Sequence, residues 1–216
     1  MLIPLIRQLI SKMRKMAAYI KNVSPFLPAY IHFQWHGHKQ AWRIFTHMTK
    51  RERLMLYRLA LKQLPGSVLL EIGSYLGSSS CFLAAAASEI RGGTKVHCVD
   101  TWKNEGMTEG QRDTWSEFQT NTLRYLTIIV PHRGHSVKIA GNFNEKIDLL
   151  FIDGDHSYDG CRIDVENWLP HLKPGGLVIM HDYEWALGVQ KVVHEFIAPR
   201  AITVGTLPNL YWAWIK

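Results

Sequence analysis

The sequence predicts an α/β protein with a doubly wound, mostly parallel sheet, and three observations support this. Short apolar runs alternate with helical stretches from residue 67 onward. Runs such as Val68–Leu70 and Leu177–Met180 are apolar at every position, as parallel strands covered by helices on both faces are. The repeated strand–helix–strand order favours parallel pairing through crossover helices.

The predicted elements follow this order along the chain. Strands are expected at Val68–Ile72, Lys95–Val99, Leu126–Val130, Ile147–Asp153 and Leu177–His181. Helices are expected between them at Ser78–Ile90, Thr108–Tyr125, Asp159–Leu172 and Glu184–Ala198. Residues 201–216 hold two β-rich runs separated by Gly205 and by Pro208-Asn209, which predicts an antiparallel hairpin at one edge of the sheet.

Composition and charge restrict the class of protein. The 216 residues are 47% hydrophobic and 20% charged, which is typical of one globular domain with a substantial core. Three widely spaced cysteines form no disulfide framework or zinc pattern, so a reducing compartment and a cytoplasmic location are expected. We expect no membrane-spanning segment, because no run is long and apolar enough.

The positive charge is concentrated at the N-terminus. Residues 1–51 contain nine of the 25 lysines and arginines and none of the 18 acidic residues. We therefore expect a basic, amphipathic helical extension over residues 1–50, followed by the α/β domain over residues 51–216. The apolar stripe of residues 2–20 would pack on the domain or on a second copy of the chain, giving a homo-oligomer, or would lie on an anionic membrane surface. Nucleic acid binding is disfavoured, because the basic residues are confined to the extension and no aromatic residues are interleaved with them as in RNA-binding motifs.

A glycine loop and an acid suggest a nucleoside ligand. In "LLEIGSYLGSSS", Gly73 and Gly77 would let the backbone approach a ligand closely, and Ser78–Ser80 would begin a helix whose N-terminus binds anions. Asp100 follows the second strand, where a carboxylate can accept hydrogen bonds from a ribose diol. The alternatives are an ordinary tight turn and a capping or surface acid. Glu71, just before the loop, suits a ligand with an ammonium group, such as S-adenosylmethionine, better than a pyrophosphate.

Four motifs carry a family resemblance: "EIGSYLGSSS", "HCVDTW", "GHSVKIAGNF" and the long stretch from Ile147 to Tyr183. Over residues 66–216 the chain resembles class I S-adenosylmethionine-dependent methyltransferases, in the branch with macrocin-type O-methyltransferases and cephalosporin hydroxylase-like proteins. The resemblance implies a seven-stranded Rossmann-like sheet, with the tail hairpin as its reversed last strands, and S-adenosylmethionine as cofactor. The residues that it implies around the cofactor are Glu71, Gly73, Ser74, Gly77 and Ser79 at the methionine part, Asp100 at the ribose, Ser136 near the adenine, and Asp153.

Two acids at the carboxyl ends of the fourth and fifth strands suggest a metal. Asp153 and Asp182 would face one crevice, and a divalent cation such as Mg²⁺ or Mn²⁺ would relieve their repulsion. The resemblance to catechol O-methyltransferase (the catechol enzyme) and to the macrocin-type enzymes supports this pair as metal ligands. Tyr183 stands where the catechol enzyme has asparagine, so the third ligand is open. Asp155 and His181 are candidates, and an imidazole would shift the preference toward transition metals.

His156 lies where the catechol enzymes carry their catalytic lysine, and a neutral imidazole is a competent general base. His156 or Asp153 would take the proton from a substrate hydroxyl. Alternatively, His156 only hydrogen-bonds a backbone carbonyl, and Asp155, Tyr158 and Asp159 only cap the next helix. The sequence thus predicts an O-methyltransferase acting on a hydroxyl of a sugar, polyketide or other secondary metabolite. The other candidates are a hydroxylase-like member of the same branch and a membrane-peripheral binding protein that retains the cofactor site.

Overall fold

The computed structural model describes residues 24–104 and 110–216, so the predicted amphipathic stripe of residues 2–20 lies outside the described residues. Contacts within the chain define two compact units, residues 1–39 and residues 40–216. In the first unit a short 3-10 helix, η1 (Ser24–Phe26), leads into α2 (Leu27–Trp35), which has a proline in its first turn. The division into an extension over residues 1–50 and a domain over residues 51–216 stays a prediction, as do the oligomer and membrane partners of the extension.

The second unit alternates strands and helices as predicted. Its strands are β1 (Val68–Ile72), β2 (Lys95–Asp100), β3 (Ile129–Arg133), β4 (Ile147–Ile152), β5 (Leu172–His181), β6 (Ala201–Leu207) and β7 (Leu210–Ile215). Its α-helices are α3 (Lys50–Ala60), α4 (Ser78–Ile90), α5 (Trp115–Thr122), α6 (Ser136–Ala140), α7 (Tyr158–Trp168) and α8 (Leu187–Val192). Short 3-10 turns η2 (Lys39–Arg43), η3 (Leu123–Tyr125), η4 (Leu169–His171) and η6 (Ala198–Arg200) and one π-helical turn, η5 (Val193–Ile197), join them. Among these described helices, none combines the length and the apolar character that crossing a bilayer requires.

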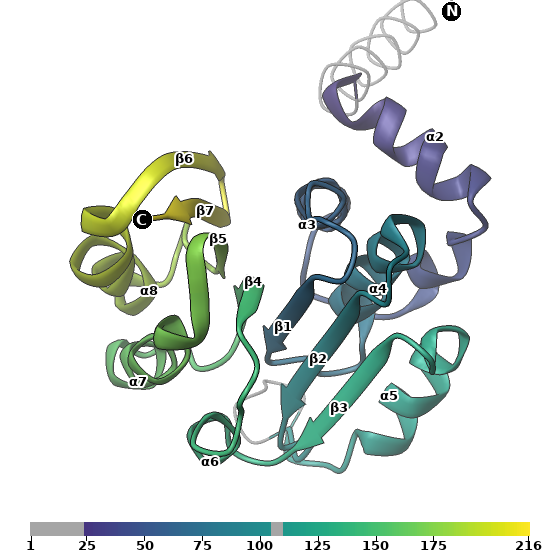
Figure 1. The fold of residues 1–216 in the computed structure, drawn as a ribbon. Helices are drawn as coiled ribbons and strands as arrows, with labels where there is room; N and C mark the ends of the chain where they lie inside the picture. Colours follow the sequence, from purple (N-terminus) through teal and green to yellow (C-terminus); the bar gives the residue numbers. More distant parts are fainter. Residues whose placement is uncertain (1–23, 105–109) are drawn as a thin grey trace, which may run out of the picture. The chain divides into compact units, whose positions relative to one another are not determined.

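The strands form one sheet in the order β3-β2-β1-β4-β5-β7-β6 (Figure 1). The five strands from β1 to β5 run parallel, and β7 lies antiparallel between β5 and β6. This confirms the predicted seven-stranded, Rossmann-like sheet with a C-terminal antiparallel hairpin. The strand order reverses between β1 and β4, and a crevice outside the carboxyl ends of the strands is expected at such a point.

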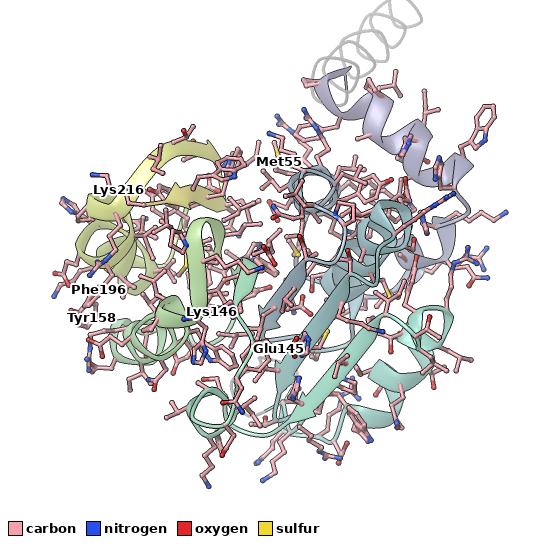
Figure 2. The ribbon with its side chains drawn as sticks, viewed as in Figure 1. Met55, Glu145, Lys146, Tyr158, Phe196 and Lys216 are labelled. Atoms are coloured by element: carbon pink, nitrogen blue, oxygen red, sulfur yellow. The ribbon has the colours of Figure 1, made fainter. Side chains whose placement is uncertain are left out.

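The helices form two layers, with α3, α4 and α5 on one face of the sheet and α6, α7 and α8 on the other (Figure 1). β1 and β4 are almost wholly buried, because both of their faces are covered. Trp168 on α7 is fully buried against Phe143, with their ring centroids 5.4 Å apart. A hydrogen bond also links α7 to η5, near the labels of Tyr158 and Phe196 in Figure 2. The Tyr158 hydroxyl donates it to Glu195 at 2.7 Å.

Several element boundaries differ from the predictions. In the described part of the helix expected over Thr108–Tyr125, α5 begins at Trp115 and is followed by η3. The third strand lies at Ile129–Arg133 instead of Leu126–Val130, because the ladder with β2 begins at Ile129 and Leu126 is exposed in the preceding turn. β5 begins five residues earlier than expected, at Leu172, although Pro174 and two glycines follow. The predicted last helix is split into α8 and the π-helical turn, and α6 was not predicted. Short elements of this kind carry too few residues for hydrophobic periodicity to reveal them.

Candidate active site

A cavity of about 920 Å³ opens at the carboxyl ends of the parallel strands, within residues 40–216. The loops after β1, β2, β3, β4 and β5 line it, together with residues 45–48, which precede α3. Among the residues predicted from sequence, the lining includes Gly73, Ser74, Ser79, Asp100, Ser136, Asp153, His156 and Asp182. Its volume suits a nucleoside-sized ligand with an acceptor beside it.

The glycine loop is shaped by close backbone packing. Gly73 has a φ of +85°, and a Cβ atom there would lie only 2.0 Å from the carbonyl oxygen of Asp153. Gly77 is the N-cap residue of α4, also at φ +85°, and does not itself line the cavity. Because glycine has no side chain to cap the helix, the first-turn N–H groups of α4 are available to an anionic ligand.

Glu71 lies beneath this loop and is fully buried. Its carboxylate accepts a hydrogen bond from the Ser80 hydroxyl, and Glu71 is not among the cavity-lining residues. Burial raises the pKa of the Glu71 carboxyl to about 7. In this structure Glu71 therefore supports the loop and the start of α4, and its predicted contact with the cofactor stays a prediction.

Replacing Glu71 with glutamine should change how stability depends on pH. A carboxyl with a raised pKa holds its proton more tightly in the folded state, so the wild-type free energy of unfolding falls as pH rises from 4.5, the ordinary pKa of a glutamate, to about 7. The shift corresponds to about 3 kcal/mol. Glutamine cannot ionise, so Glu71→Gln should gain about this much relative to the wild type between pH 4.5 and pH 8. Urea unfolding of both proteins at the two pH values measures this, and an equal difference at both would contradict it.

Asp100 lines the cavity, and backbone N–H groups hold its carboxylate in place. Its Oδ2 accepts a 2.8 Å hydrogen bond from the Tyr75 N–H, and its Oδ1 accepts a 2.7 Å bond from the Trp102 N–H. The Trp102 indole in turn donates to the Tyr75 carbonyl at 3.0 Å, which ties the glycine loop to the segment after β2.

Ser136 begins α6, and its hydroxyl donates a hydrogen bond to Asp164 on α7. Asp164 also lines the cavity, and burial raises the pKa of its carboxyl to about 6. Nothing in the sequence singles out Asp164 as a cavity residue, because a single acid inside a helix does not show which cavity it reaches.

The register of β4 and β5 changes the predicted arrangement of the acids. Ile152 pairs with Met180, so the residue laterally opposite Asp153 is His181, and Asp182 follows one position later. β5 ends at His181, as predicted, so Asp182 lies just beyond the strand, and β4 ends at Ile152, one residue before the predicted end at Asp153. His181 Nδ1 lies 2.9 Å from Asp153 Oδ1 and 3.2 Å from Asp182 Oδ2.

His181 and the neighbouring acids shift each other's pKa values. Burial alone lowers the pKa of His181, but its ion pairs with Asp153, Asp182 and Glu52 raise it to about 12. Burial raises the pKa of Asp182, but hydrogen bonds from His156 and His181 outweigh it and lower the pKa overall. The His181 imidazole, whose raised pKa favours its protonated form, thus relieves the repulsion expected between Asp153 and Asp182.

Asp182 holds His156 at the edge of the cavity. His156 Nε2 lies 2.6 Å from Asp182 Oδ2, and the pKa of His156 is raised because of this hydrogen bond. Asp182 has a φ of +57°, and its Oδ1 accepts hydrogen bonds from the Trp185 indole at 2.8 Å and from Asn209 at 3.1 Å. The partner of His156 is thus a carboxylate and not the backbone carbonyl considered as an alternative. The N-cap of α7 is Ser157, whose hydroxyl accepts from the Gly160 N–H at 3.1 Å.

The donor set fits a divalent cation. One oxygen or nitrogen atom from each of Asp153, His181 and Asp182 lies within 4.8 Å of the others. Two carboxylates with one imidazole suit Mn²⁺ or another transition metal better than Mg²⁺. Tyr183 is not part of this group, because its ring packs against Tyr211 with centroids 5.2 Å apart. The sequence left the identity of the third metal ligand open, and His181 is the candidate that fits this group.

Several residues that line the cavity lie outside the sequence motifs and were not predicted. Trp185 and Asn209 reach the cavity from the segment after β5 and from the β6–β7 turn. Phe45 to Met48 reach it from before α3. The pattern Thr49-x-x-Glu52 was a visible signal for the start of α3, but nothing in it indicates contact with a residue 129 positions later.

Comparison with known proteins agrees with this geometry. A family model described as "Methyltransferase domain" matches residues 70–183, more than half of the chain. The chain is 29% identical over 120 residues to the uncharacterized protein y4gI of Sinorhizobium fredii, a match that covers 54% of this chain but only 13% of that protein. Two solved structures share the fold at 17% identity. The O-methyltransferase from Bacillus cereus in complex with SAH has a TM-score of 0.64, with 92% of this chain and 96% of that chain covered. The O-methyltransferase TomG from Streptomyces achromogenes, involved in tomaymycin synthesis and in complex with SAM, has a TM-score of 0.61, with 78% and 81% covered.

The fold and the family match settle the resemblance noted in the sequence. The matched residues run from within β1 to the residue after Asp182 and thus include the glycine loop, Asp100, Asp153 and His156. The chain therefore belongs to the family described as "Methyltransferase domain", which agrees with the resemblance to class I S-adenosylmethionine-dependent methyltransferases noted in the sequence.

Proposed function

We propose that the chain transfers a methyl group from S-adenosylmethionine to a hydroxyl of a small molecule. The observation that carries this is the His156–Asp182 pair at the edge of a cavity with the donors that the cofactor needs. Asp100 offers acceptors to the ribose, the start of α4 offers N–H groups to the carboxylate, and Asp153 offers a negative charge to the ammonium group. When bound, the cofactor supplies a methyl group on a positively charged sulfur.

His156 is the general base of this proposal. Because its Nε2 is engaged with Asp182, its Nδ1 is the atom that accepts the proton of the substrate hydroxyl. The substrate oxygen forms its bond to the methyl carbon as the carbon–sulfur bond breaks, and the electron pair of that bond stays on sulfur. Asp182 stabilises the resulting imidazolium and orients the ring, while the cavity walls align the two partners, which supplies about 7–11 kcal/mol in well-oriented reactions.

Asp153, His181 and Asp182 would hold the divalent metal. A metal there would lower the pKa of a substrate hydroxyl. His181 must lose its Nδ1 proton to become a ligand, so proton and metal compete for the same nitrogen. The chain's own contribution is a group of donors already gathered by adjacent strand ends.

The acceptor is a hydroxylated secondary metabolite in this proposal. Two aromatic side chains stand exposed at the cavity, Phe45 (55% exposed) and Trp185 (60%), and His156 packs edge-on to Trp185 at 5.1 Å. Exposed aromatic faces beside the base suit a ring-bearing acceptor such as a sugar or polyketide. The participation of TomG in tomaymycin synthesis supports this class.

Methyl transfer itself tests the proposal. Purified protein with isotope-labelled S-adenosylmethionine and a panel of hydroxylated sugars and polyketides should yield labelled methyl ether, and calorimetry with S-adenosylhomocysteine should show binding. A hydroxylase-like member of the branch would yield an oxidised product without label. Absence of binding to either adenosyl compound would contradict the proposal.

Metal removal tests the metal. Chelation should lower the transfer rate, and Mn²⁺ should restore it at a lower concentration than Mg²⁺, because one ligand is an imidazole. Equal rates after chelation and after addition of either ion would contradict the metal site, while leaving the methyl transfer itself intact.

A further inference from the structure

The helix that precedes the family match begins with a capping box. The Thr49 hydroxyl accepts a 3.3 Å hydrogen bond from the Glu52 N–H, and Glu52 Oε2 accepts a 2.8 Å bond from the Thr49 N–H. Such a box satisfies the free donors at the start of α3. This role alone accounts for a surface glutamate, but Glu52 is only 5% exposed.

The Glu52 carboxylate has a second contact, inside the site. The same Oε2 lies 3.2 Å from His181 Nε2, and His181 is only 4% exposed. The opposite ring nitrogen, Nδ1, faces Asp153 and Asp182. A histidine held by a carboxylate at one nitrogen presents the other in a fixed direction, which is how the outer partners of metal-binding histidines act.

The segment around Glu52 belongs to the site as well. Phe45, Thr46, His47 and Met48 line the cavity just before the capping box. After it, the Arg53 guanidinium lies 3.5 Å from the Ser78 hydroxyl at the start of α4. Residues 45–53 therefore connect the cavity wall, the fifth strand and the start of α4, although the family match begins only at residue 70.

Resting on the proposed function, we infer that Glu52 is a positioning residue: it fixes the ring of His181 so that Nδ1 points between Asp153 and Asp182. The capping box makes this coupling rigid, because the start of α3 cannot shift without moving the oxygen that holds His181. The methyltransferase site is thus completed by α3, a helix that lies outside the residues matched by the family model. In the sequence, the basic residues of positions 1–51 run directly into this helix.

The test compares two variants that each break one half of the capping box. Thr49→Ala removes the hydroxyl that caps α3 but keeps the Glu52 carboxylate and its backbone partner. Glu52→Ala removes the carboxylate. Both should destabilise the protein, but only Glu52→Ala should weaken Mn²⁺ binding, about 10- to 100-fold as for other outer partners of metal ligands. In the metal-free protein, ¹⁵N NMR should show a changed His181 Nε2 signal in Glu52→Ala only. Glu52→Gln, which keeps an acceptor, should restore much of the wild-type signal.

Equal Mn²⁺ affinities and equal His181 signals in the Ala variants at positions 49 and 52 would overturn the inference. The NMR comparison decides the matter even if Glu52→Ala is too unstable for activity assays, because the His181 signal can be read in the metal-free protein as long as it is folded. If the wild type neither binds S-adenosylhomocysteine nor transfers methyl groups, the proposed function fails instead. If the wild type does both but the His181 Nε2 signal is unchanged in Glu52→Ala, only this inference fails.

Discussion

His156→Ala is expected to lower the turnover number for methyl transfer by about 10²- to 10⁴-fold, the usual contribution of a general base. Alanine leaves Asp182 without its closest partner, 2.6 Å away, and removes the only group assigned here to accept the substrate proton. S-adenosylhomocysteine affinity should change little, because the cofactor is assigned to the glycine loop and Asp100. Single-turnover kinetics with labelled cofactor, together with calorimetry, separate the two effects.

His194→Ala is the matched control for this experiment. His194 is an exposed histidine in η5 and does not line the cavity, so its removal should leave turnover unchanged. A His156→Ala variant that kept wild-type turnover would exclude the base role and leave the proton to Asp153 or to solvent.

Gly73→Ala is expected to produce the largest loss of stability. The new Cβ would lie 2.0 Å from the carbonyl oxygen of Asp153, which is backbone and cannot rotate away. The loop after β1 and the end of β4 would have to separate, so the free energy of unfolding should fall by about 3 kcal/mol more than backbone strain alone accounts for. Binding of S-adenosylhomocysteine should be lost in the same variant, because the displaced loop lines the cavity.

Gly175→Ala separates the contact from the strain. Gly175 has a similar backbone angle, φ +76° against +85° at Gly73, but a Cβ atom there would meet nothing within 4 Å. Its cost should therefore be limited to the left-handed conformation, about 1–2 kcal/mol. Urea unfolding curves of the two variants give the difference, and equal losses of stability would show that the close approach to Asp153 is tolerated.

The central strands and the glycine loop could be predicted from the sequence because their signals are local. β1 and β4 are mostly apolar runs, and α4 follows a glycine turn and begins with three serines, so periodicity and turn residues decide these elements. The tail was also predictable, since two β-rich runs flank a turn-forming Pro-Asn pair. β3 was misplaced because its apolar residues continue from an exposed turn, and only pairing with β2 sets where the ladder begins.

The arrangement of the side chains at the carboxyl ends of β4 and β5 could not be predicted from local patterns. Whether His181 or Asp182 stands opposite Asp153 depends on a one-residue register between two strands, and register is set by the packing of whole faces. The contact between Glu52 and His181 joins positions 129 residues apart, so no local pattern encodes it. The sequence therefore indicated which chemistry gathers at this edge, but the pairing of its groups required the fold.

The order of the last three strands has a consequence for how the protein is made. β7 is synthesised after β6 yet is inserted between β6 and β5, and the turn that joins them carries Asn209 to the Asp182 carboxylate. On the ribosome, β1 to β5 can assemble while this hairpin is still inside the exit tunnel, since earlier parts of a chain fold first. The nascent chain therefore exposes the open side of β5 until residues 210–215 emerge, and Asp182 gains its Asn209 hydrogen bond only once this hairpin has formed.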